Sequence, residues 1–143
     1  MSRKIEIEFE KGGKFTATFL EDKAPKTCEA VWNSLPLSGR VGHAYFSGKM
    51  MYLAGIDPKF GELENARSVG FVPGDIAYLT SYYGKDTPTE IAIIYGEALI
   101  QDFSGWIPAN HFAKISEGSL EDLKNVATRI RECGREMITI TRK

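Results

Sequence analysis

The stretch IEIEFEKGGKFTATF, residues 5–19, decides the fold because its side chains alternate between apolar and polar on both sides of a double glycine. Alternation with a period of two places one set of side chains on a single face of a strand. Gly12 and Gly13 supply the positive φ angles that a tight hairpin turn needs. The sequence therefore predicts a β-hairpin with one buried face. Its apolar residues are Ile5, Ile7, Phe9, Phe15, Ala17 and Phe19.

Two amphipathic helices are predicted further along the chain. In EDKAPKTCEAVWNSLP, residues 21–36, Pro25 suits the first turn of a helix, and Pro36 ends it. In LEDLKNVATRI, residues 120–130, apolar side chains recur at helical spacing. Ser119 is the expected N-cap of this second helix and Gly134 its stop signal.

The remaining segments indicate short strands and one long loop. Residues 41–55 are typical of two short strands around a turn at Ser47 and Gly48, and residues 56–74 are typical of a loop. Strands are also predicted at residues 75–83, 90–100 and 137–140, and the second of these is apolar throughout, as a central strand should be. About eight strands with two helices fit a closed antiparallel barrel, because closure removes exposed edges. We expect residues 1–143 to form a single domain.

Composition narrows the classes of partner. The 18 basic and 19 acidic side chains give a net charge of -1, and no run of like charges suggests a nucleic-acid partner or an anionic membrane surface. The N-terminus has no apolar core of a signal peptide, so we expect a cytoplasmic protein. Nucleotide-binding loops, a nucleophile elbow and zinc-binding spacings are all missing from the sequence. We expect no metal and no cofactor.

At this point the order of elements resembles the cyclophilins. The segment KFTATFLEDKAPKTCEAVWNSL, residues 14–35, is similar to their opening strand pair and to a helix that begins with Ala-Pro-Lys-Thr. The segment WIPANHFAKISEGSLEDL, residues 106–123, is similar to their Trp-hydrophobic-x-x-x-His pattern before a strand and a helix. The resemblance extends over nearly the whole chain. It implies a cyclophilin-like barrel in which Trp106, Ile107 and His111 line a groove for a prolyl peptide.

Two groups on which isomerase chemistry depends are missing from this sequence. In the segment HAYFSGKMMYLAGID, residues 43–57, His43 is followed by Ala44 instead of arginine, and Ala54 stands where glutamine is expected. An isomerase uses the cation to stabilise charge that develops only in the transition state. Lys49 and Arg40 are the candidate replacements, but Lys49 is a point charge rather than a planar fork and Arg40 is expected in a loop before the strand, so we expect no efficient isomerase activity. The chain therefore resembles the small, uncharacterised bacterial branch of the superfamily that lacks this arginine.

Ten residues are candidates for a ligand-binding groove, and each also has an ordinary structural interpretation in the core or in solvent. Strand alternation would place His43 and Tyr45 on one face, and a folded-back loop would bring Glu64 and Asn65 to Asn110 and His111. The complete set of candidates is His43, Tyr45, Tyr52, Glu64, Asn65, Tyr82, Trp106, Ile107, Asn110 and His111.

Three hypotheses follow. The first is a binding protein that holds a small molecule or short peptide in an aromatic groove without efficient isomerase activity. The second is an enzyme, either a prolyl isomerase with a relocated cation or an activity that uses His43 or His111 as acid or base. The third is a homo-oligomeric assembly protein with exposed aromatic side chains at its interface.

Overall fold

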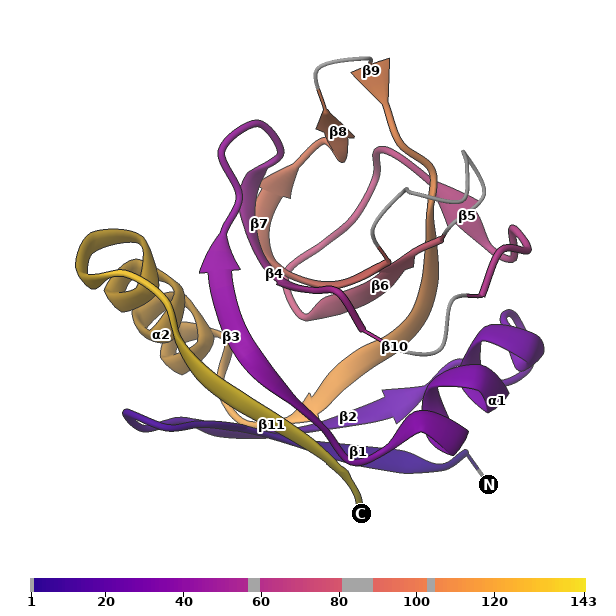
Figure 1. The fold of residues 1–143 in the computed structure, drawn as a ribbon, viewed down its shortest axis with the longest axis horizontal. Coiled ribbons are helices and arrows are strands. Elements are labelled where there is room, and N and C mark those ends of the chain that lie inside the picture. Colours follow the sequence, from indigo (N-terminus) through magenta and orange to yellow (C-terminus); the bar gives the residue numbers. More distant parts are fainter. Residues whose placement is uncertain (1, 57–59, 81–88, 103–104) are drawn as a thin grey trace.

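Eight antiparallel strands close into a barrel in the computed structural model of this protein, which describes all residues except 1, 57–59, 81–88 and 103–104 (Figure 1). The barrel strands are β1 (Lys4–Phe9), β2 (Lys14–Phe19), β3 (Leu37–His43), β4 (Gly48–Ala54), β6 (Asp75–Leu79), β7 (Glu90–Ala98), β10 (Ala109–Glu117) and β11 (Glu136–Arg142). Three further strands have two residues each: β5 (Ala66–Arg67), β8 (Gln101–Asp102) and β9 (Gly105–Trp106). The helices are α1 (Pro25–Ser34) and α2 (Leu120–Cys133).

The order of strands around the barrel is β2-β1-β11-β3-β4-β7-β6-β10, and pairing of β10 with β2 completes the ring. Every pair is antiparallel. The predicted fold class, a closed mainly β barrel with two helices, is confirmed. β5 pairs with β10, and β8 and β9 form a separate two-stranded ribbon.

The opening hairpin has the predicted turn and the predicted buried face. Ile5 lies opposite Ala17, and Ile7 lies opposite Phe15. Gly12 and Gly13 have φ angles of 116° and 117°, which only glycine adopts without strain. The apolar side chains of both strands are buried, so the alternation in the sequence marks the inner face of the barrel.

The barrel interior is filled by one apolar cluster to which all eight strands contribute. Both helices add to it: α1 through Cys28 and Val31, and α2 through Leu123 and Ile130. The two helices lie on opposite sides of the barrel in Figure 1. As predicted, Pro25 begins α1, the Ser119 side chain accepts a hydrogen bond from the Asp122 N–H, and Gly134 caps the end of α2.

A second, smaller apolar cluster lies on the outer face of β4, β7 and β6. Along β7, Ile91 and Ile93 belong to the inner cluster, whereas Ala92 and Ile94 belong to the outer one. Burial on both faces explains why this strand is apolar without alternation, as predicted for a central strand. The outer cluster is covered by segments between strands, through residues such as Phe71 and Ile107.

Several predicted bounds change in the structure. β6 ends at Leu79, and residues 81–83 of the predicted strand lie outside the described part of the chain. β3 ends at His43, so Tyr45 follows the strand and the alternation argument for the His43–Tyr45 pair does not apply. The loop that was expected at residues 56–74 contains the short strand β5.

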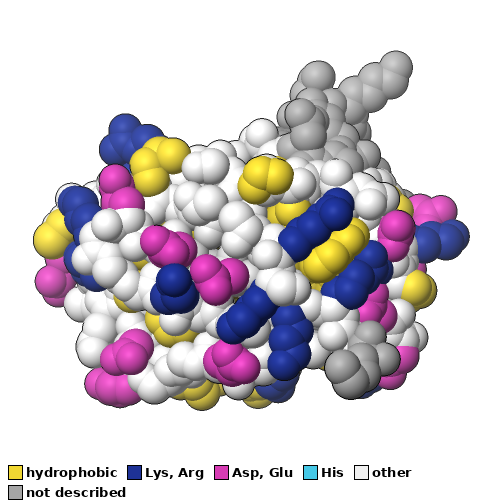
Figure 2. Space-filling model, turned by 90° about the horizontal axis from the view of Figure 1, so that it is seen from below, with side chains coloured by type: hydrophobic (Ala, Val, Ile, Leu, Met, Phe, Trp, Pro, Cys, Tyr) yellow, Lys and Arg dark blue, Asp and Glu magenta, His cyan; other side chains and the backbone are white. Residues whose placement is uncertain are grey.

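The surface carries charges of both signs. The face seen from below has acidic and basic side chains interspersed (Figure 2), in keeping with the formal net charge of -1. Among the described residues, neither helix is long and apolar enough to pass through a bilayer.

Truncating the inner core near the closure of the barrel is expected to be costly. Phe112 is fully buried, and its ring meets Phe19 edge to face with centroids 5.7 Å apart. Phe112→Ala should lower the free energy of unfolding by about 3–5 kcal/mol, as is usual for a buried aromatic residue. Urea titration followed by circular dichroism measures this change in the free energy of unfolding.

The exposed Met137 supplies the control Met137→Ala, for which a change within about 0.5 kcal/mol is expected. Equal losses in the two variants would contradict this description of the core.

Candidate functional site

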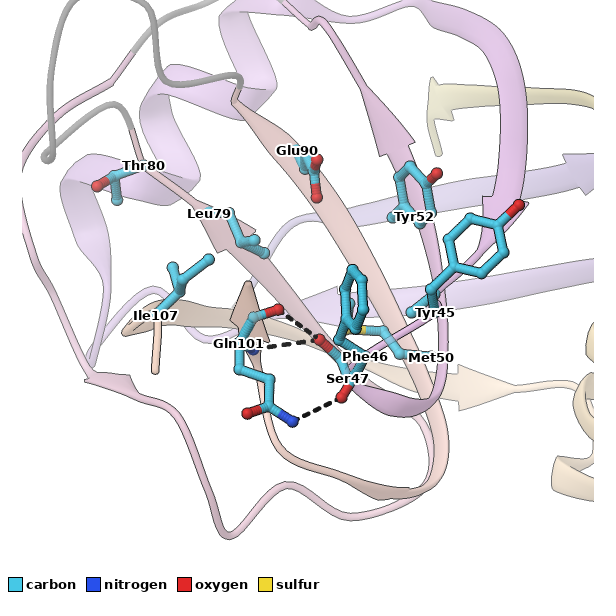
Figure 3. A pocket seen from close by; sticks show the side chains of 11 residues that line it. Tyr45, Phe46, Ser47, Met50, Tyr52, Leu79, Thr80, Glu90, Gln101 and Ile107 are labelled. Carbon is cyan, nitrogen blue, oxygen red and sulfur yellow. Dashed lines mark hydrogen bonds between the residues drawn. The ribbon is translucent and has the colours of Figure 1, made fainter. Parts of the chain in front are cut away.

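A cavity of about 320 Å³ opens on the outer face of the barrel wall, beside the smaller apolar cluster (Figure 3). Three parts of the chain form it: the β3–β4 connection with β4, the facing ends of β6 and β7, and the segment around β8 and β9. Most of its lining is apolar or aromatic. The lining residues are Ala44, Tyr45, Phe46, Ser47, Met50, Tyr52, Leu79, Thr80, Glu90, Gln101 and Ile107.

Strand register explains why the wall residues face outward together. Tyr52 pairs with Ala92, and Leu79 pairs with Glu90. Because directly paired residues in a sheet point to the same face, and every second residue of a strand does too, Tyr52, Leu79 and Glu90 share the outer face with Met50. The neighbouring residues of these strands point into the barrel. The wall of the cavity is therefore fixed by the same pairing that builds the barrel.

The β3–β4 connection, residues 44–47, is held against β8 by hydrogen bonds. The Ser47 hydroxyl accepts from the Gln101 N–H at 3.2 Å, and the Gln101 side-chain amide donates to the Phe46 carbonyl at 2.7 Å (Figure 3). The Ala44 N–H donates to the Met50 carbonyl at 2.9 Å. Tyr45 is nevertheless 88% exposed and Phe46 48% exposed. This connection thus presents two aromatic rings to solvent on a well-anchored backbone.

Among the described residues that line the cavity, Glu90 is the charged one. Its carboxylate is half-buried and forms no hydrogen bond or ion pair with any residue that the structure describes. Desolvation raises the pKa of Glu90 above its ordinary value, although the positive charge of Arg135 opposes the shift. An acceptor without a partner in an apolar cavity is suited to a ligand that brings a hydrogen-bond donor.

A second polar group of residues lies around His111 in β10. His111 Nε2 lies 3.1 Å from Asp75 Oδ1, off the direction of a regular hydrogen bond, and its Nδ1 lies 3.0 Å from an Arg67 nitrogen. Because arginine only donates, Nδ1 must accept, which puts the ring hydrogen on Nε2 facing Asp75. Asp75 Oδ2 also accepts from the Val72 N–H at 2.8 Å, and Lys114 lies 3.5 Å from Oδ1. The network ties the loop before β6 to β10.

Asp75 remains ionised in this network although it is 1% exposed. Burial alone would raise its pKa, but the interaction with His111, the Val72 N–H and the charge of Lys114 outweigh burial and lower the pKa of Asp75 below its ordinary value. His111 is itself buried, with the Phe71 ring at its edge, and it lines neither this cavity nor the one described below. Its contacts are those of a structural residue.

The pairs Glu64–Asn65 and Asn110–His111 do meet, but at the start of α1 and not at the cavity. The Glu64 carboxylate accepts from the Thr27 N–H at 2.6 Å and the Lys26 N–H at 3.1 Å, which satisfies free donors of the helix. The Glu64 N–H donates to the Asn110 side chain at 2.8 Å, and the Asn65 side chain donates to the His111 carbonyl at 2.9 Å. These four residues connect the long loop to β10.

The other candidate residues are distributed around the barrel. Tyr45, Tyr52 and Ile107 line the cavity. His43 is not among the residues that line this cavity, and its Nε2 lies 2.6 Å from the Tyr95 hydroxyl. Trp106 is 65% exposed on β9 and is absent from the cavity lining.

Tyr82 lies outside the described residues. Sequence reasoning missed Phe46, Met50, Leu79, Glu90 and Gln101, although a glutamate at the head of an apolar strand was a usable signal for Glu90.

Comparisons with known proteins give the family and the fold. Residues 7–142 match the family described as protein of unknown function, DUF3830. No curated protein matches the sequence. The fold is similar to that of McbB, solved in complex with tryptophan, with a TM-score of 0.76 and 19% identity over 97% of this chain; the chain spans only 44% of the length of McbB. It is also similar to the hypothetical protein AF2241 from Archaeoglobus fulgidus, with a TM-score of 0.66 and 22% identity over 99% of this chain and 95% of that one.

The Asp75 network makes a pH-dependent contribution to stability. Because the folded pKa of Asp75 is lowered, this contribution is present above the ordinary aspartate pKa of about 3.9 and is lost as the pH falls through the folded pKa. Asp75→Asn should therefore lower the free energy of unfolding at pH 7 by about 2 kcal/mol. The difference from the wild type should shrink below about pH 4, as measured by urea titrations across the pH range.

The exposed Asp22 provides the matched control, since Asp22→Asn removes the same charge without touching a network. If Asp75→Asn behaved like this control at pH 7, Asp75 would not stabilise the loop on β10.

Proposed function

This chain belongs to the DUF3830 family, and we propose that it is a binding protein whose outer cavity holds an apolar or aromatic group of a small molecule or short peptide. This proposal rests on the lining of that cavity, which combines apolar walls with the Glu90 carboxylate, for which the described residues supply no partner. A ligand that places an ammonium or amide N–H opposite Glu90 and a ring against Tyr52 and Ile107 would satisfy both features.

Exposure of the aromatic side chains supports this function. Tyr45 keeps most of its surface in water although the backbone on either side is anchored. Covering an aromatic ring removes up to about 150–250 Å² of surface from water, and a preformed site loses little conformational freedom on binding. Tyr45, Phe46 and Tyr52 are therefore the side chains through which we expect most of the ligand contact.

The same cavity argues against efficient prolyl isomerisation. Ala44, which follows His43 where the cyclophilin resemblance would require arginine, lines the cavity with a methyl group. Neither Lys49 nor Arg40 is among the described residues that line it. Loss of one donor that stabilises developing charge typically costs a factor of about 100 to 1000 in rate. A cyclophilin-like domain without the isomerase cation is the interpretation that we favour.

The structure of McbB offers a first probe, because that protein was solved with tryptophan. We propose that the indole ring of such a compound also fits the outer cavity of this chain, with the amino group of its side chain toward Glu90. Indole compounds with different charges then allow the shape of the cavity and its charge to be tested separately.

A homo-oligomer is the alternative that the exposed rings leave open. A symmetric contact through Tyr45 and Phe46 would cover the same surface as a ligand. Sedimentation analysis of the wild type beside Tyr45→Ala distinguishes the two, since only an interface would make the assembly state depend on Tyr45.

Binding through the outer cavity should depend on the charge of the ligand. Tryptamine should bind the wild type more tightly than the anionic indole-3-propionate, and Glu90→Gln should weaken tryptamine binding on the order of tenfold. As the pH is lowered, protonation of Glu90 should reduce tryptamine affinity. Because the pKa of Glu90 is raised, this loss should begin at a higher pH than it would for an ordinary glutamate. Isothermal titration calorimetry measures each affinity.

Glu97→Gln is the matched control, because Glu97 lies on the same strand but outside this cavity. Tryptamine affinity should be unchanged in that variant. Absence of saturable binding by either indole compound and by tryptophan would refute an indole-sized site, and equal losses in Glu90→Gln and Glu97→Gln would refute the role of Glu90.

The isomerase hypothesis has its own test. In a protease-coupled assay with a prolyl peptide, micromolar protein should not accelerate isomerisation above the uncatalysed rate, because no cation lines the described cavity. Acceleration that disappears in Lys49→Ala would show instead that a relocated cation restores the activity.

A further inference from the structure

We propose that a second cavity, on the other side of the Ala44–Tyr45 segment, binds the phosphate group of a small molecule. This cavity has a volume of about 510 Å³ and lies between β3, β4, β7 and the end of α2. It is separate from the outer cavity, and the proposed phosphate binding does not depend on an aromatic ligand in that cavity. Its lining residues are His43, Ala44, Tyr45, Gly48, Lys49, Tyr95, Ile130, Arg131, Gly134 and Arg135.

The charge of this lining is of one sign. Lys49, Arg131 and Arg135 contribute three cations, and none of the lining residues in the described chain is an aspartate or glutamate. None of the three forms an ion pair with a residue that the structure describes. In a chain with a net charge of -1, three cations around one cavity, without an ion pair to any described residue, are a local concentration of positive charge.

Two glycines make room for these cations. A Cβ atom on Gly96 of β7 would collide with Cδ of Lys49, and a Cβ atom on Gly42 of β3 would lie 3.1 Å from Cζ of Arg135. The stem of Lys49 and the guanidinium of Arg135 therefore lie directly on backbone that carries no side chain. Both side chains are packed in place, which reduces the entropy that they lose when an anion binds.

Hydrogen-bond donors accompany the charges. The Arg135 guanidinium donates to the Tyr52 hydroxyl at 2.6 Å, which uses one of its five N–H groups and leaves others for a ligand. His43 Nδ1 lies 2.9 Å from the Ala44 carbonyl and must donate to it, so in the neutral ring Nε2 accepts from the Tyr95 hydroxyl.

A structural role for the cations accounts for only part of this arrangement. Arg131 lies in the last turn of α2, where a positive charge is favourable by itself. That explanation does not apply to Lys49 on β4, whose stem crosses from β4 to Gly96. Three cations also exceed what one carboxylate needs, whereas a phosphate monoester carries a charge of about -1.5 to -2 near pH 7. The lining therefore favours phosphate over a monoanion.

Calorimetric titration with inorganic phosphate, methyl phosphate and acetate at fixed ionic strength tests the assignment. Both phosphate compounds should bind saturably and more tightly than acetate. Comparing the affinity for inorganic phosphate with that for methyl phosphate shows whether the site prefers free phosphate or an ester. Arg131→Gln should weaken phosphate binding about tenfold. Lys124→Gln, which removes an exposed charge from the same helix outside the cavity, should leave it unchanged. Gly96→Ala, which displaces Lys49 without removing charge, should also weaken it.

The outcomes separate this site from the outer cavity. Arg131→Gln should leave tryptamine affinity unchanged, so failure of either site does not decide the other. No saturable binding of either phosphate compound at millimolar concentration would overturn the assignment. Equal weakening in Arg131→Gln and Lys124→Gln would also overturn it, because the effect would then reflect overall charge alone.

Discussion

Closure of the sheet by the pairing of β10 with β2 is the constraint on which the other features of this molecule depend. Once the ring is complete, the inward side chains of all eight strands meet the two helices and leave the interior filled. A barrel of this size has an interior that side chains occupy. The outer cavity lies outside this filled interior, whereas the second cavity is lined in part by Tyr95 and Ile130, which belong to the inner cluster.

The outer face of the wall can carry a site because β4, β7 and β6 are covered only in part. The smaller apolar cluster extends under the loops around Phe71 and Ile107, and the cavity begins where this cover ends. Strand pairing fixes the floor of the cavity, and the hydrogen bonds between Ser47 and Gln101 fix one side. The side chains that would meet a ligand are thus held by backbone contacts that the fold already requires.

Local patterns in the sequence predicted the elements, and they failed where distant segments meet. The hairpin at Gly12 and Gly13 and the start of α2 at Ser119 depend on residues a few positions apart, so the sequence alone was sufficient. Glu64 satisfies the start of α1 from 37 positions away, which no periodicity could indicate. Tyr45 was assigned to a strand that ends at His43, because the chain leaves the sheet to reach Gln101 through contacts that only the fold reveals.

The two cavities meet at Ala44 and Tyr45, which line both, and they differ in charge. Tyr52 lines the outer cavity and Arg135 lines the second one, yet the Tyr52 hydroxyl and the Arg135 guanidinium are in contact, with the cation 5.2 Å from the ring. The positive charge of Arg135 opposes the rise in the pKa of Glu90 that burial causes. Glu90 is therefore easier to ionise than its burial alone would allow, because the charge of Arg135 acts on it from the second cavity. The charge of Arg135, a residue of the second cavity, thus favours the ionised form of a carboxylate in the outer one.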